Sequence, residues 1–148
     1  MTGSPPDIRG AREVVDWFGY WPTFHDAEVL SITLDRSVGT RVEIHAFERT
    51  SEVDADGYYV LAKHAIVTFS LQEFPLDSQG ITNVQIDHFN HQNVLSSIGV
   101  EKVPDGYLLT LDGIFGVYAS ISCKHISVEL EPGPPRGYHP HIALNAAK

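Results

Sequence analysis

Apolar residues recur at helical spacing near the start of the chain. They are Ile8, Ala11, Val15 and Phe18. Ser4 can cap a helix, Pro5 suits its first position, and the Asp7 carboxylate can meet the free N–H groups of the first turn. Gly19 offers a stop. The pattern predicts a helix that begins near Pro5, ends before Gly19 and packs one face on the rest of the protein.

From residue 27 the apolar period changes to two, which predicts half-buried strands. The core positions expected for the first two strands are Leu30, Ile32, Leu34, Val42, Ile44 and Ala46. Two further strands are expected near residues 58–72 and 81–88. Polar turns separate these strands at residues 36–39, 48–57 and 73–80.

The second half of the chain breaks this alternation. In "NHQNVLSSIG", Asn90 can cap a short helix near residues 91–98, with Val94, Leu95 and Ile98 on one side. The Asp-Gly pairs of "VPDGY" and "LDGIF" are typical of hairpin turns. In the last strand the apolar positions change from odd to even numbers after Cys123, which predicts a β-bulge near residues 124–125.

Short turns between strands favour antiparallel pairing over βαβ crossovers. The predicted fold class is therefore α+β: an antiparallel, meander-like sheet of about six to seven strands, with the N-terminal helix packed on it and the short helix near residues 91–98. We expect a single domain over residues 1–148 with a core at about 5–131. The Pro-rich segment 132–148 is expected to lie extended on the surface.

The 148 residues carry a formal charge of −9, which disfavours direct binding to phosphate backbones. Such an acidic surface suits a basic protein partner, although it can also serve solubility alone. No apolar run approaches the roughly 20 residues that cross a bilayer. The N-terminus "MTGSPPDIRG" lacks the apolar stretch of a secretory signal, so we expect a cytoplasmic protein without membrane contact. Oligomeric state stays open.

Several catalytic and metal motifs fail on inspection. The alternation around Cys123 predicts a buried thiol, not a nucleophile paired with His125. Glu52, Asp54 and Asp56 fit the start of a calcium loop, but Lys63 stands where the bidentate glutamate belongs. The paired histidines are His88 and His91, and His139 and His141. Helical zinc pairs need a spacing of three or four residues on one continuous helix, whereas His88 is expected to end a strand and His91 to begin a short helix, so we expect no metal and no cofactor.

The densest polar chemistry is "FHDAE", where His25, Asp26 and Glu28 precede a strand. Partial burial there could raise a carboxyl pKa and produce a general acid. The structural alternative has Asp26 accepting backbone N–H groups at the strand entrance. Glu28 would then pair with an arginine or the Trp21 indole. No nucleophile or oxyanion donor is evident nearby, which favours the structural interpretation.

"WPTFHDAEVLSITLDR", "FNHQNVL" and "GIFGVYASISCKHISVEL" together resemble the family numbered fifty among the immunity proteins of bacterial polymorphic toxin systems. The likeness spans roughly residues 17–130. Its signature residues are Phe24, His25, Asp26, Glu28, Phe89, Asn90, His91 and Asn93, which we interpret as framework positions.

The resemblance implies a non-enzymatic protein that binds and neutralises a cognate protein toxin. An acidic inhibitor suits a basic nuclease, and we expect Glu52, Asp54 and Asp56 to contribute to the contact. Two alternatives stay open: a small hydrolase or metal-dependent enzyme that uses His25, Asp26 and Glu28, and a plain interaction domain without a toxin.

Overall fold

The computed structural model describes residues 4–37, 39–71 and 81–138. These ranges contain one helix, α1 (Ala11–Phe18), and eight strands. The strands are β1 (Glu28–Asp35), β2 (Gly39–Val53), β3 (Tyr59–Ser70), β4 (Ile81–Asp87), β5 (Val94–Val103), β6 (Gly106–Phe115), β7 (Tyr118–Cys123) and β8 (Ser127–Pro132). No helix in the described ranges is long and apolar enough to span a membrane. The predicted turn at residues 73–80 and the pair His139 and His141 lie outside the described residues.

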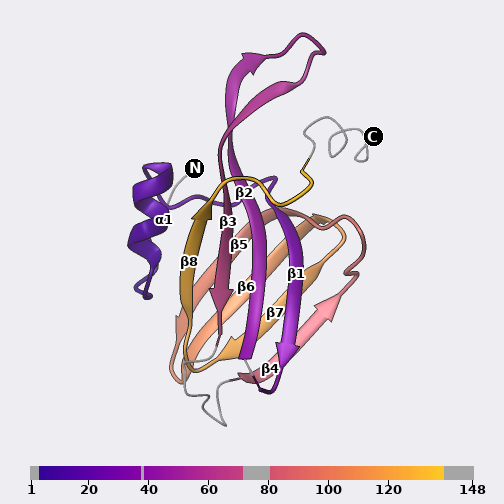
Figure 1. Cartoon of the computed structure of the whole chain (residues 1–148). Coiled ribbons are helices and arrows are strands. Elements are labelled where there is room, and N and C mark those ends of the chain that lie inside the picture. The colour runs from indigo at the N-terminus through magenta and orange to yellow at the C-terminus, as the bar shows by residue number, and fades with distance from the viewer. Residues whose placement is uncertain (1–3, 38, 72–80, 139–148) are drawn as a thin grey trace.

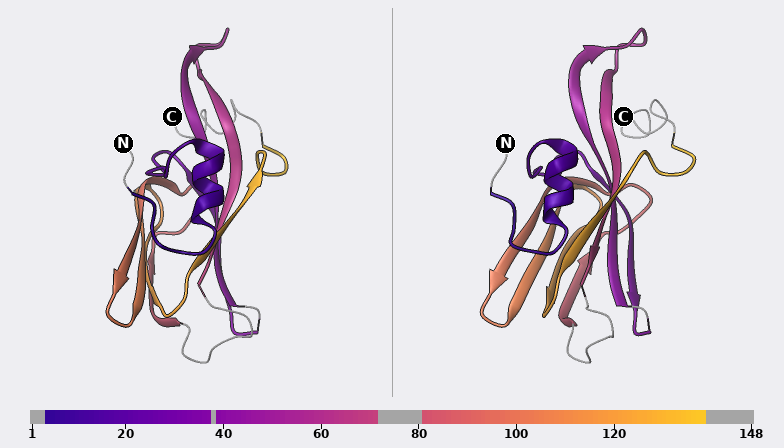
Figure 2. Two further views of the ribbon diagram at one scale, coloured as in Figure 1. Left: turned by 90° about the vertical axis from the view of Figure 1, so that its left-hand side faces the viewer. Right: turned by 60° about the vertical axis from the view of Figure 1, so that its left-hand side comes forward.

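All eight strands form one sheet, and every pair of neighbouring strands is antiparallel, in the order β4-β7-β6-β5-β1-β2-β3-β8. The sheet is folded over on itself, so that β8, β3, β2 and β1 lie in front of β5, β6, β7 and β4 (Figure 1). The fold lies between β1 and β5, whose ladder holds the single pair Glu28 and Val94. Side views show the two layers and α1 beside β8 (Figure 2). The predicted α+β class is confirmed, with eight strands where six to seven were expected.

The hydrophobic core fills the space between the two layers. Its fully buried side chains include Val42, Ile44, Val67 and Phe69 from one layer and Leu109, Leu111, Ala119 and Ile121 from the other. Burial of such a side chain contributes about 1.5–3 kcal/mol. The apolar side chains that alternate along β2 therefore face the core, as predicted.

The helix starts later than the pattern predicts, at Ala11. Residues just before it run along β8 instead: Arg9 forms a bridge with Ser127, and the Val128 N–H donates to the Arg9 carbonyl at 2.9 Å. Gly10 adopts φ 91°, and a Cβ at this position would lie 1.7 Å from the Val128 oxygen. Pairing with β8 and this close approach keep the segment extended.

The end of α1 is as predicted. Gly19 adopts φ 88°, and its N–H donates to the Val15 carbonyl at 2.7 Å. The buried side chains of the helix are Ala11, Val14 and Phe18. This face packs mainly against β8 and belongs to the common core.

The prediction of a short helix near residues 91–98 is wrong, because this segment enters strand β5. Its ladder with β6 contains register shifts between Val94 and Leu95 and between Leu95 and Ser97. An extra residue in a bulge returns the chain to the same face after three positions instead of two. Leu95 and Ile98 are therefore both buried at a spacing that imitates a helix.

Two expectations for the C-terminal strands are also wrong. The Asp-Gly pair of "LDGIF" lies within β6, and the turn comes at Gly116 with φ 77°. The change of apolar parity after Cys123 is not a bulge. It marks the end of β7 and the start of β8, which pair with strands of opposite layers. The Asp-Gly turn of "VPDGY" does join β5 and β6 as predicted.

Strand β1 keeps only part of its predicted core face. Ile32 packs against the core, whereas Leu30 and Leu34 are exposed. The register with β2 shifts between Val29 and Ser31, so Leu30 is an extra residue, and the core-facing positions change from Val29 before the bulge to Ile32 after it. Val29 is buried in its place.

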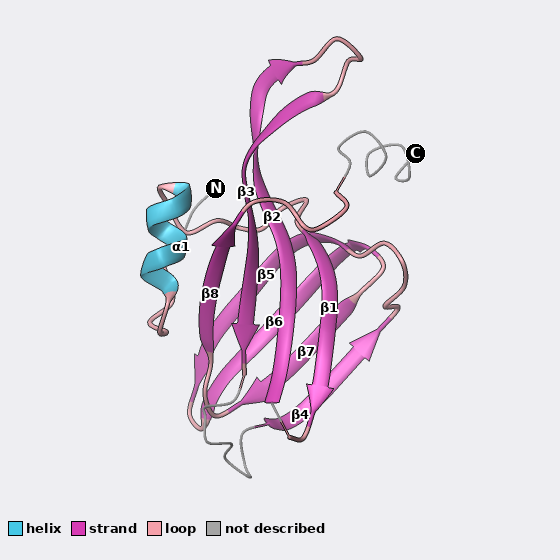
Figure 3. Ribbon diagram, in the orientation of Figure 1, coloured by secondary structure: helices cyan, strands magenta, loops and turns pink. Residues whose placement is uncertain are grey.

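The hairpin of β2 and β3 projects beyond the rest of the sheet (Figure 3). Register shifts between Ala46 and Glu48 and between Arg49 and Val53 separate it from the body, and Lys63 adopts φ 52° opposite the first shift. Such irregularities bend and twist a strand pair. They leave the outer part of the hairpin standing free above the sheet.

Candidate functional site

The "FHDAE" segment forms a tight corner at the entrance to β1. Phe24 and Asp26 adopt left-handed conformations, with φ of 66° and 67°. The Phe24 ring is buried and makes edge contacts with Trp21, at 5.6 Å between ring centroids, and Phe69, at 6.1 Å. These contacts hold a backbone conformation that non-glycine residues rarely adopt.

Asp26 plays a different part from the one predicted. Within the described ranges its carboxylate accepts no backbone hydrogen bond, and its one ion-pair contact is His25 Nε2 at 3.5 Å, on an exposed surface. Its own N–H donates to the Leu95 carbonyl at 2.8 Å. Aspartate tolerates the left-handed region better than most residues. The corner therefore favours aspartate at position 26 because of the backbone conformation that it can adopt.

The "FNHQNV" segment is organised by the buried Asn93. Its Oδ1 accepts from the Asn90 N–H at 3.0 Å and the Val117 N–H at 3.1 Å, and its Nδ2 donates to the Asn90 carbonyl at 2.7 Å. Asn90 caps no helix, and its Oδ1 accepts from the Gln92 N–H at 3.0 Å. Phe89 and His91, from the same signature, are exposed. Asn93 thus fixes both the β4–β5 loop and the β6–β7 turn.

The two signature segments meet where the sheet folds over. The Val29 N–H donates to the Asn93 carbonyl, and the Leu95 N–H donates to the Ala27 carbonyl, each at 2.8 Å. His25 Nδ1 lies 3.2 Å from the Ser96 carbonyl. The two signature segments are therefore hydrogen-bonded to each other where β1 meets β5.

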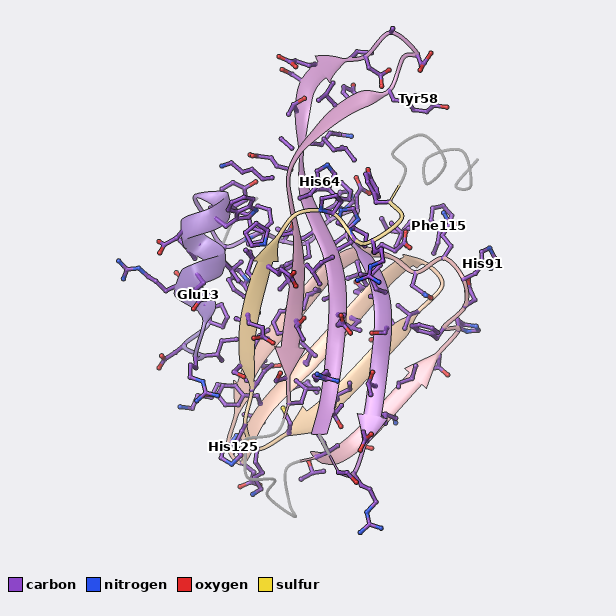
Figure 4. The ribbon with its side chains drawn as sticks, in the orientation of Figure 1. Glu13, Tyr58, His64, His91, Phe115 and His125 are labelled. Atoms are coloured by element: carbon purple, nitrogen blue, oxygen red, sulfur yellow. The ribbon has the colours of Figure 1, made fainter. Side chains whose placement is uncertain are left out.

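A cavity of about 320 Å³ lies beside these corners, at the base of the projecting hairpin. Five segments line it, with Asp26, Glu28, His45, Phe47, Arg49, Gly57, Tyr58, Tyr59, Leu61, Gln92, Val94, Phe115 and Tyr138. Figure 4 shows Tyr58 on the hairpin and Phe115 below it. Five of the lining side chains are aromatic rings, so the cavity combines apolar walls with a few charged groups, as binding sites do.

Glu28 brings a carboxylate to this cavity. It is half-buried, and burial raises its pKa. Among the described residues it has neither the predicted arginine partner nor a bond to the Trp21 indole. Within the described residues, the Glu28 side chain makes no other hydrogen bond or ion pair. The carboxylate therefore faces the cavity without a partner.

His45 lies opposite Glu28 in the ladder of β1 and β2 and is 4% exposed. Its Nε2 lies 3.0 Å from His64 Nδ1, so one of the two nitrogens donates to the other. Tyr138 covers the pair, with its ring centroid 4.9 Å from that of His45. Burial, and then the neighbouring His64, lower the pKa of His45 to about 4. Both rings are neutral at neutral pH, because burial also lowers the pKa of His64.

The acidic loop forms the tip of the hairpin. Asp54 Oδ1 accepts from the N–H groups of Asp56 at 2.9 Å and Tyr58 at 3.0 Å, which closes the turn. Glu52 is exposed beside it. Below the tip, the Arg49 guanidinium lies 4.8 Å from the centre of the Tyr59 ring. The tip is thus an ordered, negatively charged projection, and its contact with a partner stays a prediction.

The residues of the enzyme alternative do not line one cavity together. His25 lines a second cavity of about 270 Å³, Glu28 lines the first, and Asp26 lies between the two. Residues 4–37, 39–71 and 81–138 contain no group of three histidine, cysteine or acidic side chains that could hold a metal. Burial raises the pKa of the Cys123 thiol to about 11, as its apolar surroundings predict.

The sequence patterns did not reveal the cavity. The lining residue His45 and its partner His64 stand in the stretches "IHA" at residues 44–46 and "KHA" at residues 63–65, in strands that pair with each other. A histidine followed by alanine on each of two neighbouring strands was the available signal. The aromatic walls come from the hairpin, the end of β6 and the segment after β8, so no local pattern indicates them.

Comparison with known proteins gives one family. No curated protein and no solved structure matches the chain. The family model of Immunity protein 50 matches residues 10–131, which include the helix, both signature segments and nearly the whole sheet. The chain therefore belongs to the Immunity protein 50 family.

Proposed function

We propose that this protein protects its cell by binding a cognate protein toxin in the cytoplasm and blocking it through direct contact. The family assignment over residues 10–131 is the observation that carries this proposal. An immunity protein of this kind needs a binding surface and no catalytic centre. The aromatic cavity and the projecting hairpin support such a surface, because exposed aromatic side chains are enriched where proteins bind each other.

The charge of the protein supports a basic toxin. A net charge of −9 attracts a positively charged partner and repels nucleic acid. Nucleases carry basic surfaces because they hold phosphates. A nuclease whose phosphate-binding surface is covered by this protein is the toxin class that the charge favours.

The test is co-expression. The gene beside this one should encode a large toxin with a variable C-terminal domain, and that domain alone should arrest growth in a host cell. Co-expression of this protein should restore growth, and the two purified proteins should elute as one complex. An unrelated toxin domain serves as the control and should stay toxic. Continued growth arrest with both proteins expressed and folded would contradict the proposal.

A further inference from the structure

The cavity at the base of the hairpin contains a half-buried acid without a partner. Glu28 faces aromatic walls, and no described side chain pairs with it. Apolar surroundings make an unpaired carboxylate unfavourable, so such a group is normally paired or moved to the surface. A cation from outside the protein would satisfy it.

The walls suit a flat cation. Tyr59 and Phe115 are about half exposed, at 50% and 51%, and both line the cavity. Arginine stacks its guanidinium on aromatic faces and binds carboxylates in a bidentate way, whereas lysine acts as a point charge. Arg49 already lies over the Tyr59 ring at 4.8 Å. This contact within the protein shows that the walls accept a guanidinium.

The balance of charge favours a cation despite Arg49. Asp26 and Glu28 both line the cavity, and among the described residues Arg49 is the one lysine or arginine that lines it. The hairpin tip adds Glu52, Asp54 and Asp56 above it. Negative groups around a low-dielectric cavity focus a negative potential there, and this potential attracts a positively charged partner.

We propose that this cavity is the docking site for the toxin, and that it receives an arginine side chain projecting from the toxin's basic surface. The guanidinium pairs with Glu28 and stacks between the rings of the hairpin and Phe115. The acidic tip faces neighbouring basic groups of the toxin. This inference rests on the proposed function and adds the surface and the chemistry of the contact.

The experiment measures the affinity of the purified full-length protein for its cognate toxin domain. Glu28→Gln keeps the shape of the side chain and removes its charge, and we expect it to weaken binding about 30-fold or more. Phe115→Ala removes a wall and should weaken binding about tenfold. Both sites are partly exposed, so thermal unfolding should show that the variants stay folded.

Two matched controls lie away from the cavity. Glu101→Gln removes an exposed carboxylate on β5, and Leu34→Ala truncates an apolar side chain that is 56% exposed near the end of β1. Both should bind like the unchanged protein. A set of toxin variants with single arginines and lysines changed to glutamine then identifies the toxin side chain that enters the cavity. One arginine variant should be insensitive to Glu28→Gln, because the two changes remove the same pair.

The outcomes separate the two proposals. If the unchanged protein does not bind the toxin, the proposed function fails. If it binds and neither cavity variant differs from the controls, the cavity is not the docking site. If Phe115→Ala weakens binding and Glu28→Gln does not, the cavity binds an apolar side chain of the toxin, and the proposal of an arginine is wrong. If a lysine variant of the toxin, and not an arginine variant, is insensitive to Glu28→Gln, the proposal of an arginine in the cavity is also wrong.

Discussion

Glu28 and His45 face each other across β1 and β2, and burial pushes both toward their neutral forms. The pKa of the carboxyl is raised and that of the imidazole is lowered. His45 gains compensation from His64 at 3.0 Å, while Glu28 gains none from the described residues. His45 is thus satisfied within the fold, whereas Glu28 has no partner among the described residues.

The lowered pKa of His45 makes stability depend on pH. The unfolded ring binds a proton below about 6.5 and the folded ring below about 4, so between these values the unfolded state holds more protons. Stability should therefore fall by about 2 kcal/mol as the pH drops through this range. Urea unfolding at a series of pH values measures it. His45→Gln should show a shallower fall, and parallel curves would contradict the assignment.

The left-handed conformation of Asp26 gives a second prediction at this scale. Asp26→Asn should change the free energy of unfolding by less than about 0.5 kcal/mol, because asparagine tolerates this conformation. Asp26→Val should lose about 1–2 kcal/mol, because a β-branched residue does not. Asp112→Val, at an exposed position of β6 without positive φ, is the control. A large loss in Asp26→Asn would show instead that the carboxylate itself matters.

At the scale of elements, the sequence predicts what local alternation determines and fails where a bulge changes it. The core face of β2 and the stop at Gly19 follow from single residues and their neighbours. Bulges in β1 and β5 shift the apolar spacing, which exposes Leu30 and makes β5 imitate a helix. A bulge is stabilised by contacts with the neighbouring strand, and one segment read alone does not contain them.

Asn93 connects elements that are distant in sequence, so substituting it tests the framework role. Its Oδ1 satisfies the buried Val117 N–H, so Asn93→Ala would leave this donor without a partner. We expect a loss of about 2–4 kcal/mol in urea unfolding. Asn83→Ala on β4, whose side chain is exposed, should change stability by less than about 0.5 kcal/mol. Equal effects at the two positions would show that the Asn93 network contributes little.

At the scale of the molecule, the candidate site depends on how the sheet folds over. The cavity combines the start of β1, the hairpin of β2 and β3, and residues from β5, β6 and the segment after β8. These segments become neighbours only through the strand order, which local turns do not determine. The sequence indicated the acidic tip, Asp26 and Glu28, because these are local features. It did not indicate that Glu28 would face aromatic rings from distant strands.

The charge of the whole molecule predicts how the complex forms. If the toxin is basic, as proposed above, its attraction to a protein of charge −9 should speed association and be screened by salt. The association rate should fall about tenfold between about 50 mM and about 500 mM salt. Stopped-flow mixing of the two proteins measures it.

Glu52→Gln at the exposed tip should slow association and leave dissociation nearly unchanged, because it alters only the long-range field. Glu28→Gln should instead speed dissociation, since it removes a contact made in the bound state. This contrast separates steering by the tip from docking in the cavity. An association rate that does not depend on salt would contradict electrostatic steering by the tip and the proposal of a basic toxin. The docking role of the cavity would still be tested by the cavity variants.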